Sequence, residues 1–328
     1  MSAPVHTQAT RWARRPPLRI RRARGAALLL AMLTVTLVAT FAAASMWQQW
    51  RAVEVEAAER GRVQSAWILI GALDFSRLIL REDARSGGPD HLAEPWAVPL
   101  QESRLSTFLA AENNVSQVDD ASTDTTEAFL SGQITDMQGR LNLTNLAVGD
   151  QVDGSAQRQF ARLFERLGLP QQELGRLVQG LRQAKGILGK DPSSPLMPPT
   201  VGQLGWLGLS PATQAALAPH VTLLPERTLV NANTASVDVL LAAIDDLDIA
   251  GAQKIVQVRE SRHFRSASEV NTLIGGNANC GCSVQSSYFE VRGRLRIGDT
   301  MVDERSLVRR VGAQVTTLWR ERGAFDRE

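Results

Sequence analysis

The chain begins with a basic segment that is followed by one long apolar run. Ala26 to Trp47 are 22 consecutive residues without a charged side chain. About 20 apolar residues, at a helical rise of about 1.5 Å each, are enough to span the hydrocarbon core of a bilayer. The pattern therefore predicts one membrane-spanning helix over about residues 26–47.

The helical period continues beyond the apolar run. Apolar residues recur at helical spacing from Val63 to Leu80, and the first break signal is the sequence Ser86-Gly87-Gly88-Pro89. This spacing predicts one helix over 26–86 whose second half is amphipathic and packs on a sheet.

Two alternating segments lie on either side of a helical middle section. Alternation from Gly132 to Leu146 predicts two strands joined by a turn at Gln138-Gly139, and alternation from Tyr288 to Ile297 predicts another strand. Residues 155–275 show mostly helical periodicity, in two sub-blocks separated by a Pro/Ser-rich linker. We expect an α+β fold in which segments 87–154 and 276–328 form one small antiparallel sheet domain, packed on the long helix and interrupted by a large all-α insertion.

The charge distribution fixes the expected orientation. The first 25 residues hold seven arginines and no acidic residue. Excess Lys/Arg stays on the cytoplasmic side, and Trp47 and Trp50 are placed for an interfacial aromatic belt on the far side. Residues 51–328 are thus expected in the periplasm of a bacterium, with the helix in the inner membrane. The alternative is ordinary signal cleavage after Ala44, which would remove the helix.

The basic leader also hides an acidic remainder. Without its seven arginines the chain has 29 basic and 34 acidic side chains, a net charge of −5. This balance gives the exterior part no evident affinity for nucleic-acid phosphates.

The junction Arg24-Gly25-Ala26, followed by an apolar helix, resembles the class III leader of type IV pilins and type II secretion pseudopilins. The resemblance implies that a prepilin peptidase removes the cytoplasmic leader 1–25 by cutting between Gly25 and Ala26, and then methylates Ala26. The fifth residue of the mature chain is Leu30, where most of the superfamily has a glutamate.

Four further segments are similar to the K-type minor pseudopilins of type II secretion, the GspK family, and follow the family's order: Leu80–Leu100, Thr135–Leu146, Leu229–Ile244 and Ser286–Asp299. The resemblance implies a non-enzymatic subunit at the pseudopilus tip, which initiates and caps assembly for export of folded periplasmic proteins across the outer membrane. It implies a SAM-like domain in the insertion. The apolar Leu30 is itself a trait of K subunits and fits the tip, because a topmost subunit has no neighbour's amine to neutralise.

The same resemblance implies a set of partners. These are the minor pseudopilins I and J, with H and the major pseudopilin G further down the fibre, together with the inner-membrane assembly platform and the prepilin peptidase.

Two groups of residues suggest additional chemistry. Cys280 and Cys282 are separated by one glycine. In an oxidising compartment they can form a short disulfide, with free thiols and a metal site as alternatives. The acidic run Val118–Glu127 is most simply a solvated loop, and calcium is the sharper alternative, because hard cations prefer clustered carboxylates. The calcium candidates are Asp119, Asp120, Asp124 and Glu127. The family implies calcium, but its Asp- and Gly-rich linker is replaced here by Lys190–Pro195.

Two other functions, a DNA-binding protein and an enzyme, fit the sequence less well than a pseudopilin. Asn231–Leu273 is similar to the helix-hairpin-helix of membrane-anchored DNA-uptake receptors, but its turn carries the carboxylates of Asp245, Asp246 and Asp248, which would repel phosphates. An enzyme is not predicted. His91, His220 and His263 lie in three different segments, without the spacing of a nucleophile and its base.

Overall fold

The structure is a computed structural model that describes residues 24–107, 128–148, 151–185, 194–275, 280–298 and 300–323. The chain divides into two units, residues 1–63 and residues 64–328, which we describe separately. Helix α1 (Arg24–Ser86) begins in the first unit and ends in the second.

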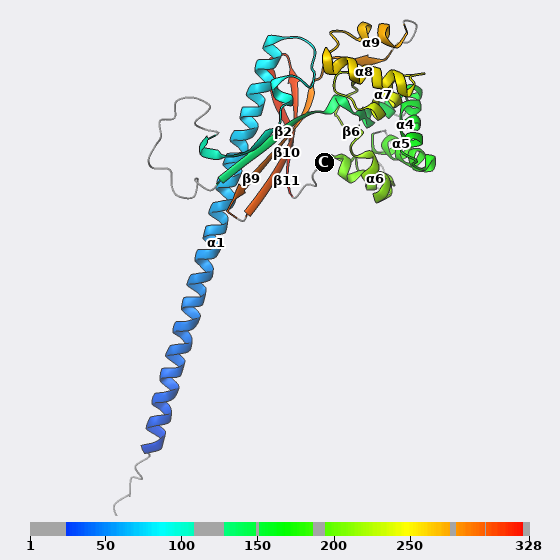
Figure 1. Cartoon of the computed structure of the whole chain (residues 1–328). Helices are drawn as coiled ribbons and strands as arrows, with labels where there is room; N and C mark the ends of the chain where they lie inside the picture. Colours follow the sequence, from blue (N-terminus) through cyan, green and yellow to red (C-terminus); the bar gives the residue numbers. More distant parts are fainter. Residues whose placement is uncertain are drawn as a thin grey trace, which may run out of the picture. The chain divides into compact units, whose positions relative to one another are not determined.

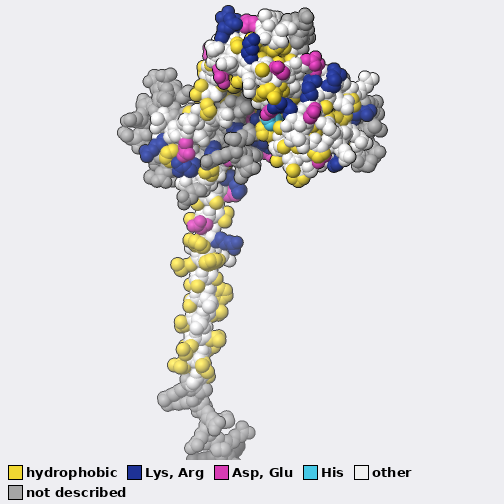
Figure 2. All heavy atoms as spheres, turned by 45° about the vertical axis from the view of Figure 1, so that its right-hand side comes forward, with side chains coloured by type: hydrophobic (Ala, Val, Ile, Leu, Met, Phe, Trp, Pro, Cys, Tyr) yellow, Lys and Arg dark blue, Asp and Glu magenta, His cyan; other side chains and the backbone are white. Residues whose placement is uncertain are grey.

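The described part of the first unit is the apolar beginning of α1. Its large apolar side chains are exposed, and they cover the surface of this segment in Figure 2. By length and composition this helix can cross a membrane, with a mean hydropathy of 2.3 in its most apolar stretch. Leu28, Leu33 and Phe41, each more than 60% exposed, have no protein core to enter, so a lipid environment accounts for them.

The second unit contains a five-stranded antiparallel sheet with the strand order β1-β2-β9-β10-β11 (Figure 1). Strands β2 and β9 are neighbours in the sheet, although the helical section lies between them in sequence. The strands are β1 (Leu100–Arg104), β2 (Ala128–Asp136), β9 (Tyr288–Ile297), β10 (Thr300–Val311) and β11 (Gln314–Gly323).

The second half of α1 packs on this sheet. Leu69, Leu73 and Leu80 recur at helical spacing and are buried against the strands. Gly293 of β9 allows the close approach, because a Cβ there would lie 3.2 Å from a methyl carbon of Leu69. The helix ends at Ser86, where Gly87 adopts a φ of 67° that a larger residue would resist. The predicted α+β class, with a long apolar helix and an antiparallel sheet, is confirmed.

The section between β2 and β9 folds around its own apolar core. The amphipathic α4 contributes Phe160, Leu163 and Phe164, which are fully buried with Leu177 and Leu240. We call this section the helical block. Its helices are α4 (Gly154–Arg166), α5 (Gln171–Lys185), the 3₁₀ helix η5 (Val201–Leu207), α6 (Pro211–Leu217), α7 (Val237–Ala243), α8 (Ile249–Ser261) and α9 (Ala267–Ile274).

Side-chain caps start several of these helices. Ser236 caps α7 by accepting from the Val239 amide, and Asp248 caps α8 by accepting from the Gly251 amide at 2.7 Å. Caps of this kind satisfy amides that lack a partner in the first turn. Serine and aspartate are among the residue types most favoured at the N-cap, so these two helix starts agree with local sequence preference.

The two strands joined by a turn that alternation predicts in Gly132–Leu146 are present, but they do not pair with each other. After β2 the chain makes a 3₁₀ turn at Met137–Gly139, and the next strand, β3 (Leu141–Asn142), pairs in parallel with β6 (Val221–Thr222). Alternation does not identify these partners, because Leu141 and Asn142 are both buried and the pattern does not separate a core face from a solvent face. The block also contains two other short ladders, β4 (Ala147–Val148) with β5 (Gln151–Val152) and β7 (Val230–Asn231) with β8 (Cys282–Ser283).

Candidate functional site

Within the second unit, α1 exposes an apolar stripe opposite its buried face. Trp67 is 69% exposed and Leu78 is 42% exposed, and Gly71 lies between them at helical spacing. No atom of the described residues lies within 4 Å of the position that a Cβ on Gly71 would occupy. We call Trp67, Gly71 and Leu78 the α1 stripe. A glycine inside a helix costs about 1 kcal/mol relative to alanine, and no contact from the described part of the chain offsets that cost here.

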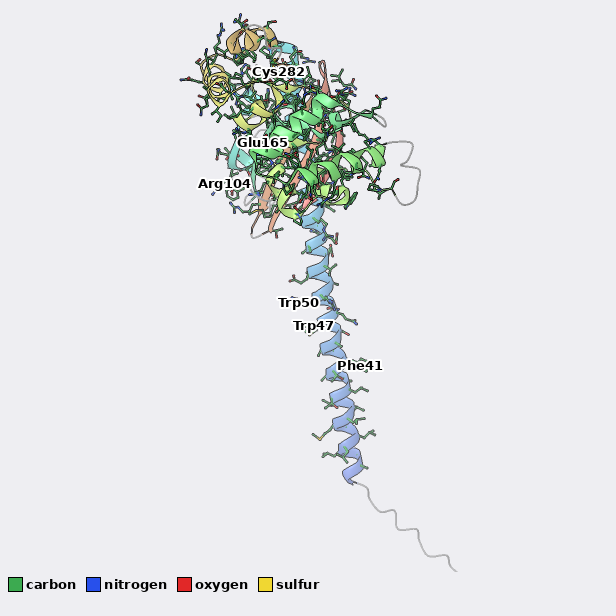
Figure 3. All side chains as sticks on the ribbon, turned by 90° about the vertical axis from the view of Figure 1, so that its right-hand side faces the viewer. Phe41, Trp47, Trp50, Arg104, Glu165 and Cys282 are labelled. Carbon is green, nitrogen blue, oxygen red and sulfur yellow. A yellow bond between two sulfur atoms is a disulfide. The ribbon has the colours of Figure 1, made fainter. Side chains whose placement is uncertain are left out.

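The residues predicted for processing lie at the start of α1. Gly25 and Ala26 are exposed and helical, and Leu30 is 64% exposed in the same apolar segment. Cleavage between Gly25 and Ala26, methylation of Ala26 and the role of Leu30 stay predictions. Further along, the rings of Trp47 and Trp50 lie 5.4 Å apart, centroid to centroid, and both project from the helix in Figure 3.

A buried polar cluster joins the helical block to the sheet. Asp136, at the end of β2, accepts hydrogen bonds from Asn231 (3.0 Å), Thr234 (2.6 Å) and Ser286 (2.7 Å). Its other carboxylate oxygen accepts from the Gln138 amide at 2.8 Å. We call Asp136, Asn231, Thr234 and Ser286 the polar junction. Asn231 and Thr234 belong to the block, so the block is fixed to the sheet by specific hydrogen bonds as well as by chain connections.

A second set of charged groups surrounds the end of α1. Arg310 of β10 donates to both Asp83 and Asp90, and Asp90 also accepts from the Ser286 amide at 2.7 Å. Burial raises the pKa of Asp90, and the Arg310 guanidinium opposes that shift. Burial likewise raises the pKa of Asp136, which has only neutral hydrogen-bond donors in this cluster. The guanidinium therefore balances the carboxylates nearest to it, while Asp136 depends on neutral donors.

Glu94 orders the loop between α1 and β1. One of its carboxyl oxygens accepts from the His91 amide and from the Trp96 indole, each at 2.8 Å. Burial, together with the neighbouring Asp83, raises the pKa of Glu94 to about 7. Trp96 is 1% exposed and packs edge-on against Phe289, so this tryptophan belongs to the core.

Two histidines that are far apart in sequence meet in the structure. The rings of His91 and His263 are stacked, with centroids 3.8 Å apart and planes 7° apart. His91 follows α1 and His263 lies between α8 and α9, so no local pattern signals the contact. His220 lies elsewhere in the block, half-buried, and burial lowers its pKa.

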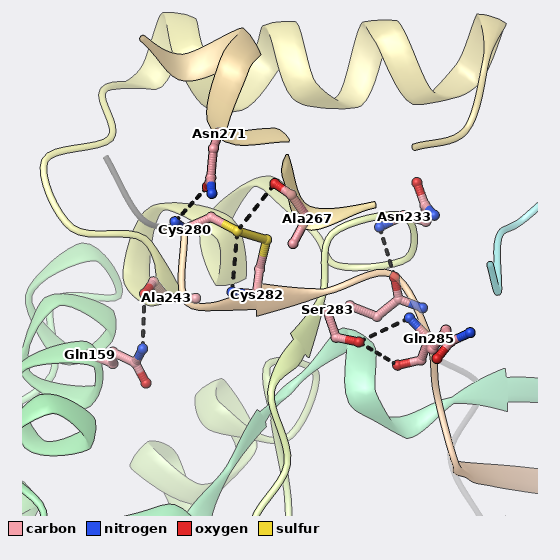
Figure 4. Close-up of a disulfide and its surroundings, with 10 residues drawn as sticks. Gln159, Asn233, Ala243, Ala267, Asn271, Cys280, Cys282, Ser283 and Gln285 are labelled. Atoms are coloured by element: carbon pink, nitrogen blue, oxygen red, sulfur yellow. Dashed lines mark hydrogen bonds between the residues drawn. A yellow bond between two sulfur atoms is a disulfide. The ribbon is translucent and has the colours of Figure 1, made fainter. Parts of the chain in front are cut away.

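Cys280 and Cys282 form a disulfide in the structure (Figure 4). Both side chains are buried in the core of the helical block. The Cys280 amide donates to Asn271 of α9 at 2.8 Å, and Cys282 begins the strand that pairs with β7. The disulfide therefore lies in the segment that leads from the helical block back to the sheet.

The calcium candidates Asp119, Asp120, Asp124 and Glu127 lie outside the described residues. Calcium binding by these residues stays a prediction.

The acidic turn of the helix-hairpin-helix is engaged within the subunit. Asp245 forms an ion pair with Arg162 at 2.7 Å. Asp248 already accepts from the Gly251 amide, one of the groups at the start of α8 that a DNA phosphate would need. This arrangement disfavours the DNA-uptake alternative.

Comparison with known proteins shows a consistent relationship. Family models for type II secretion system protein K match residues 139–226 and 230–292. The type II secretion system protein K of Pseudomonas aeruginosa is 29% identical over 312 residues, which cover 85% of this chain and 86% of the relative. The protein K of Klebsiella pneumoniae is 26% identical, over 93% and 98% of the two chains. Over most of its length, the chain is therefore similar to type II secretion system protein K.

The fold agrees with this similarity. A chain in the crystal structure of the GspK-GspI-GspJ complex from the type 2 secretion system of enterotoxigenic Escherichia coli superposes with a TM-score of 0.61, at 18% identity. The superposition covers 82% of this chain and 99% of the other. The similarity to type II secretion system protein K and the apolar N-terminal helix fit a single-pass inner-membrane protein.

Proposed function

We propose that this protein is the minor pseudopilin at the tip of a type II secretion pseudopilus, where it initiates and caps assembly. In this proposal the leader 1–25 is cytoplasmic and is removed, and the segment from residue 51 is periplasmic. The partners are I- and J-type minor pseudopilins, with H and the major subunit below them. The observation that carries the proposal is the combination of a membrane-compatible α1 with an exposed α1 stripe on its outer half.

The α1 stripe supports contact with a partner helix. Small residues allow helix backbones to approach closely, and an adjacent large side chain then packs into the partner's groove. Gly71 supplies such a notch, and Trp67 and Leu78 supply exposed apolar surface on both sides of it. A partner helix would offset the helical cost of the glycine. The GspK-GspI-GspJ complex of the Escherichia coli system supports I- and J-type proteins as the partners.

The helical block supports a capping role. It adds a separate apolar core to a small sheet subunit, and the polar junction fixes it to β2 and to the start of β9. A rigidly attached block of this size would obstruct the addition of another subunit on the same side. Leu30 agrees with a terminal position, because it offers no carboxylate to a neighbour's amine.

The test is a substitution that has opposite effects on the free subunit and on the complex. Gly71→Ala should stabilise the free subunit by about 0.5–1 kcal/mol, because alanine is the better helix former and the added methyl group meets nothing. The same methyl group should weaken co-purification with I- and J-type pseudopilins from detergent-solubilised membranes.

Gly175→Ala is the matched control. Gly175 is also an exposed helical glycine with open space at the Cβ position, but it lies in α5 of the helical block. This variant should gain stability and keep its partners. Undiminished recovery of both partners with Gly71→Ala would contradict the proposed docking face.

A further inference from the structure

The stacked pair His91–His263 connects two parts of the second unit that lie far apart in the sequence. His91 belongs to the loop after α1, and this loop is held to the sheet side by Asp90 and Arg310. His263 is held by its neighbour Phe264, whose amide and carbonyl both bond to the Asn233 side chain at 2.9 Å. The backbone next to each histidine is therefore held in place by hydrogen bonds of its neighbour.

The geometry defines the protonation state of His91. Its Nδ1 accepts a hydrogen bond from the Ala93 amide at 3.2 Å, so Nδ1 carries no proton in this arrangement. A proton on Nδ1 would place a donor opposite a donor and would add a positive charge against the face of His263. Both effects oppose the stack.

The two rings are accessible to solvent protons. They line an open cavity of about 300 Å³ together with residues of α8. A buried pair without such access would exchange protons only when the structure opens, whereas this pair can respond directly to the pH of its surroundings.

We propose that the His91–His263 stack is an acid-sensitive contact, which opens below about pH 6.5 and loosens the hold of the loop after α1 on the helical block. The inference concerns regulation within the subunit and goes beyond the proposed function. The acid-sensitive contact requires no partner protein, so this proposal and the proposed tip function can fail independently.

Burial and the neighbouring ring favour the neutral form of His91. On the block side, Arg259, Glu260 and Arg262 line the same cavity, and Arg262 forms an ion pair with Glu269 at 3.6 Å. On the other side, Arg310 is bound to Asp83 and Asp90, and Glu94, with a pKa of about 7, binds a proton in the same acid range. Burial lowers the pKa of His91, His263 lowers it further, and Asp83 acts against both.

The direction of the pH effect follows from that shift. The unfolded or opened segment binds a proton more readily than the stacked one, so the contact is complete above the ordinary histidine pKa of about 6.5. It is lost progressively as the pH falls below that value.

Hydrogen-deuterium exchange of the full chain in detergent micelles tests the proposal. After correction for intrinsic exchange chemistry, peptides covering residues 87–98 and 259–268 should exchange about tenfold faster at pH 5.0 than at pH 7.5. Peptides from β9 and β10 should change less than twofold. His91→Phe keeps a flat ring in the stack but removes the group that binds the proton, so it should reduce the response of both peptides to less than twofold. His220→Gln, in another part of the block, should leave the response unchanged.

Two results would overturn the proposal: no acid response in the wild-type chain, or the same response in His91→Phe. If that variant does not fold, an NMR titration of the histidine rings in the wild-type chain decides. The His91 signals should titrate with a midpoint below 6.5, and the His263 signals should shift in the same step. Titration of His91 at the ordinary value, without a response from His263, would also overturn it.

Discussion

Removing the Asp136 carboxylate should detach the helical block from the sheet more than it unfolds either part. In Asp136→Ala, two buried donors, the Gln138 amide and the Ser286 hydroxyl, lose the acceptor they have in the structure. Asn231 keeps the Asp90 carbonyl at 3.1 Å, and Thr234 has the Asn231 carbonyl at 3.5 Å. An unsatisfied buried donor costs about 1–3 kcal/mol, and loss of the poorly solvated carboxylate offsets part of this. We expect a net loss of about 2–4 kcal/mol.

The assay is native-state hydrogen exchange on the full chain in detergent. A loss of that size corresponds to exchange about 30 to 900 times faster in peptides covering 229–236 and 284–290, since about 1.4 kcal/mol is a factor of ten. Peptides from α4 and α5 should change less, because neither helix contributes a residue to the polar junction, although their core also contains Val230, Ala232 and Ala235 beside it. Thr234→Val, which leaves Asp136 its three other donors, should cost only about 1 kcal/mol. If Asp136→Ala changed exchange by less than fivefold, the polar junction would not be what holds the block.

Three further predictions address processing, the tip position and pH. Gly25→Leu should leave the precursor uncut, whereas N-terminal sequencing of the wild-type mature chain should begin at Ala26; a start after residue 44 would mean ordinary signal cleavage. Leu30→Glu should disfavour membrane insertion or assembly by about 2.5–3.5 kcal/mol. Leu30→Ala, expressed at the same level, should leave secretion nearly unchanged. Secretion at the wild-type level by the glutamate variant would contradict the tip position. Glu94, with a folded pKa of about 7 against an ordinary value near 4.5, binds its proton more tightly when folded. Its stabilising contribution is therefore complete below about pH 4.5 and is lost as the pH rises through 7. Glu94→Gln should reduce the decline in the free energy of unfolding by urea between pH 5 and pH 8 by about 2–3 kcal/mol. The same decline in the variant as in the wild-type chain would refute this.

Local pattern was sufficient for the elements whose faces differ in polarity. The apolar period of α1 from Val63 to Leu80 predicts a packed face, and Leu73 and Leu80 are buried in it. Trp67 and Leu78 belong to the same period but are exposed, because they lie on the opposite side of the helix. The caps Ser236 and Asp248 mark helix starts from sequence because a cap acts on amides only a few residues away.

The features that the sequence did not predict depend on long-range contacts. Asp90 and Arg310 are 220 residues apart, and His91 and His263 come from segments with no shared motif. For a related reason, alternation in Gly132–Leu146 predicts the strands and the turn but not the strand partners. Asn142 is buried because its side chain bonds to the Glu226 carbonyl at 2.7 Å, so a polar residue occupies a position that alternation assigns to solvent. Periodicity describes which face of an element is apolar, but it does not identify the distant partner that makes a buried polar residue acceptable.

The most direct test of the central claim is the position of this protein in assembled pseudopili. The full-length chain, with an epitope tag at its C-terminus, should be co-expressed with the I, J, H and G pseudopilins, and the sheared fibres should be labelled with gold-conjugated antibody. The tip assignment predicts one label at one end of each fibre, and recovery of the tagged chain with I and J in a stoichiometric complex. Label distributed along the fibres, or fibres of normal number and length formed without this chain, would contradict it.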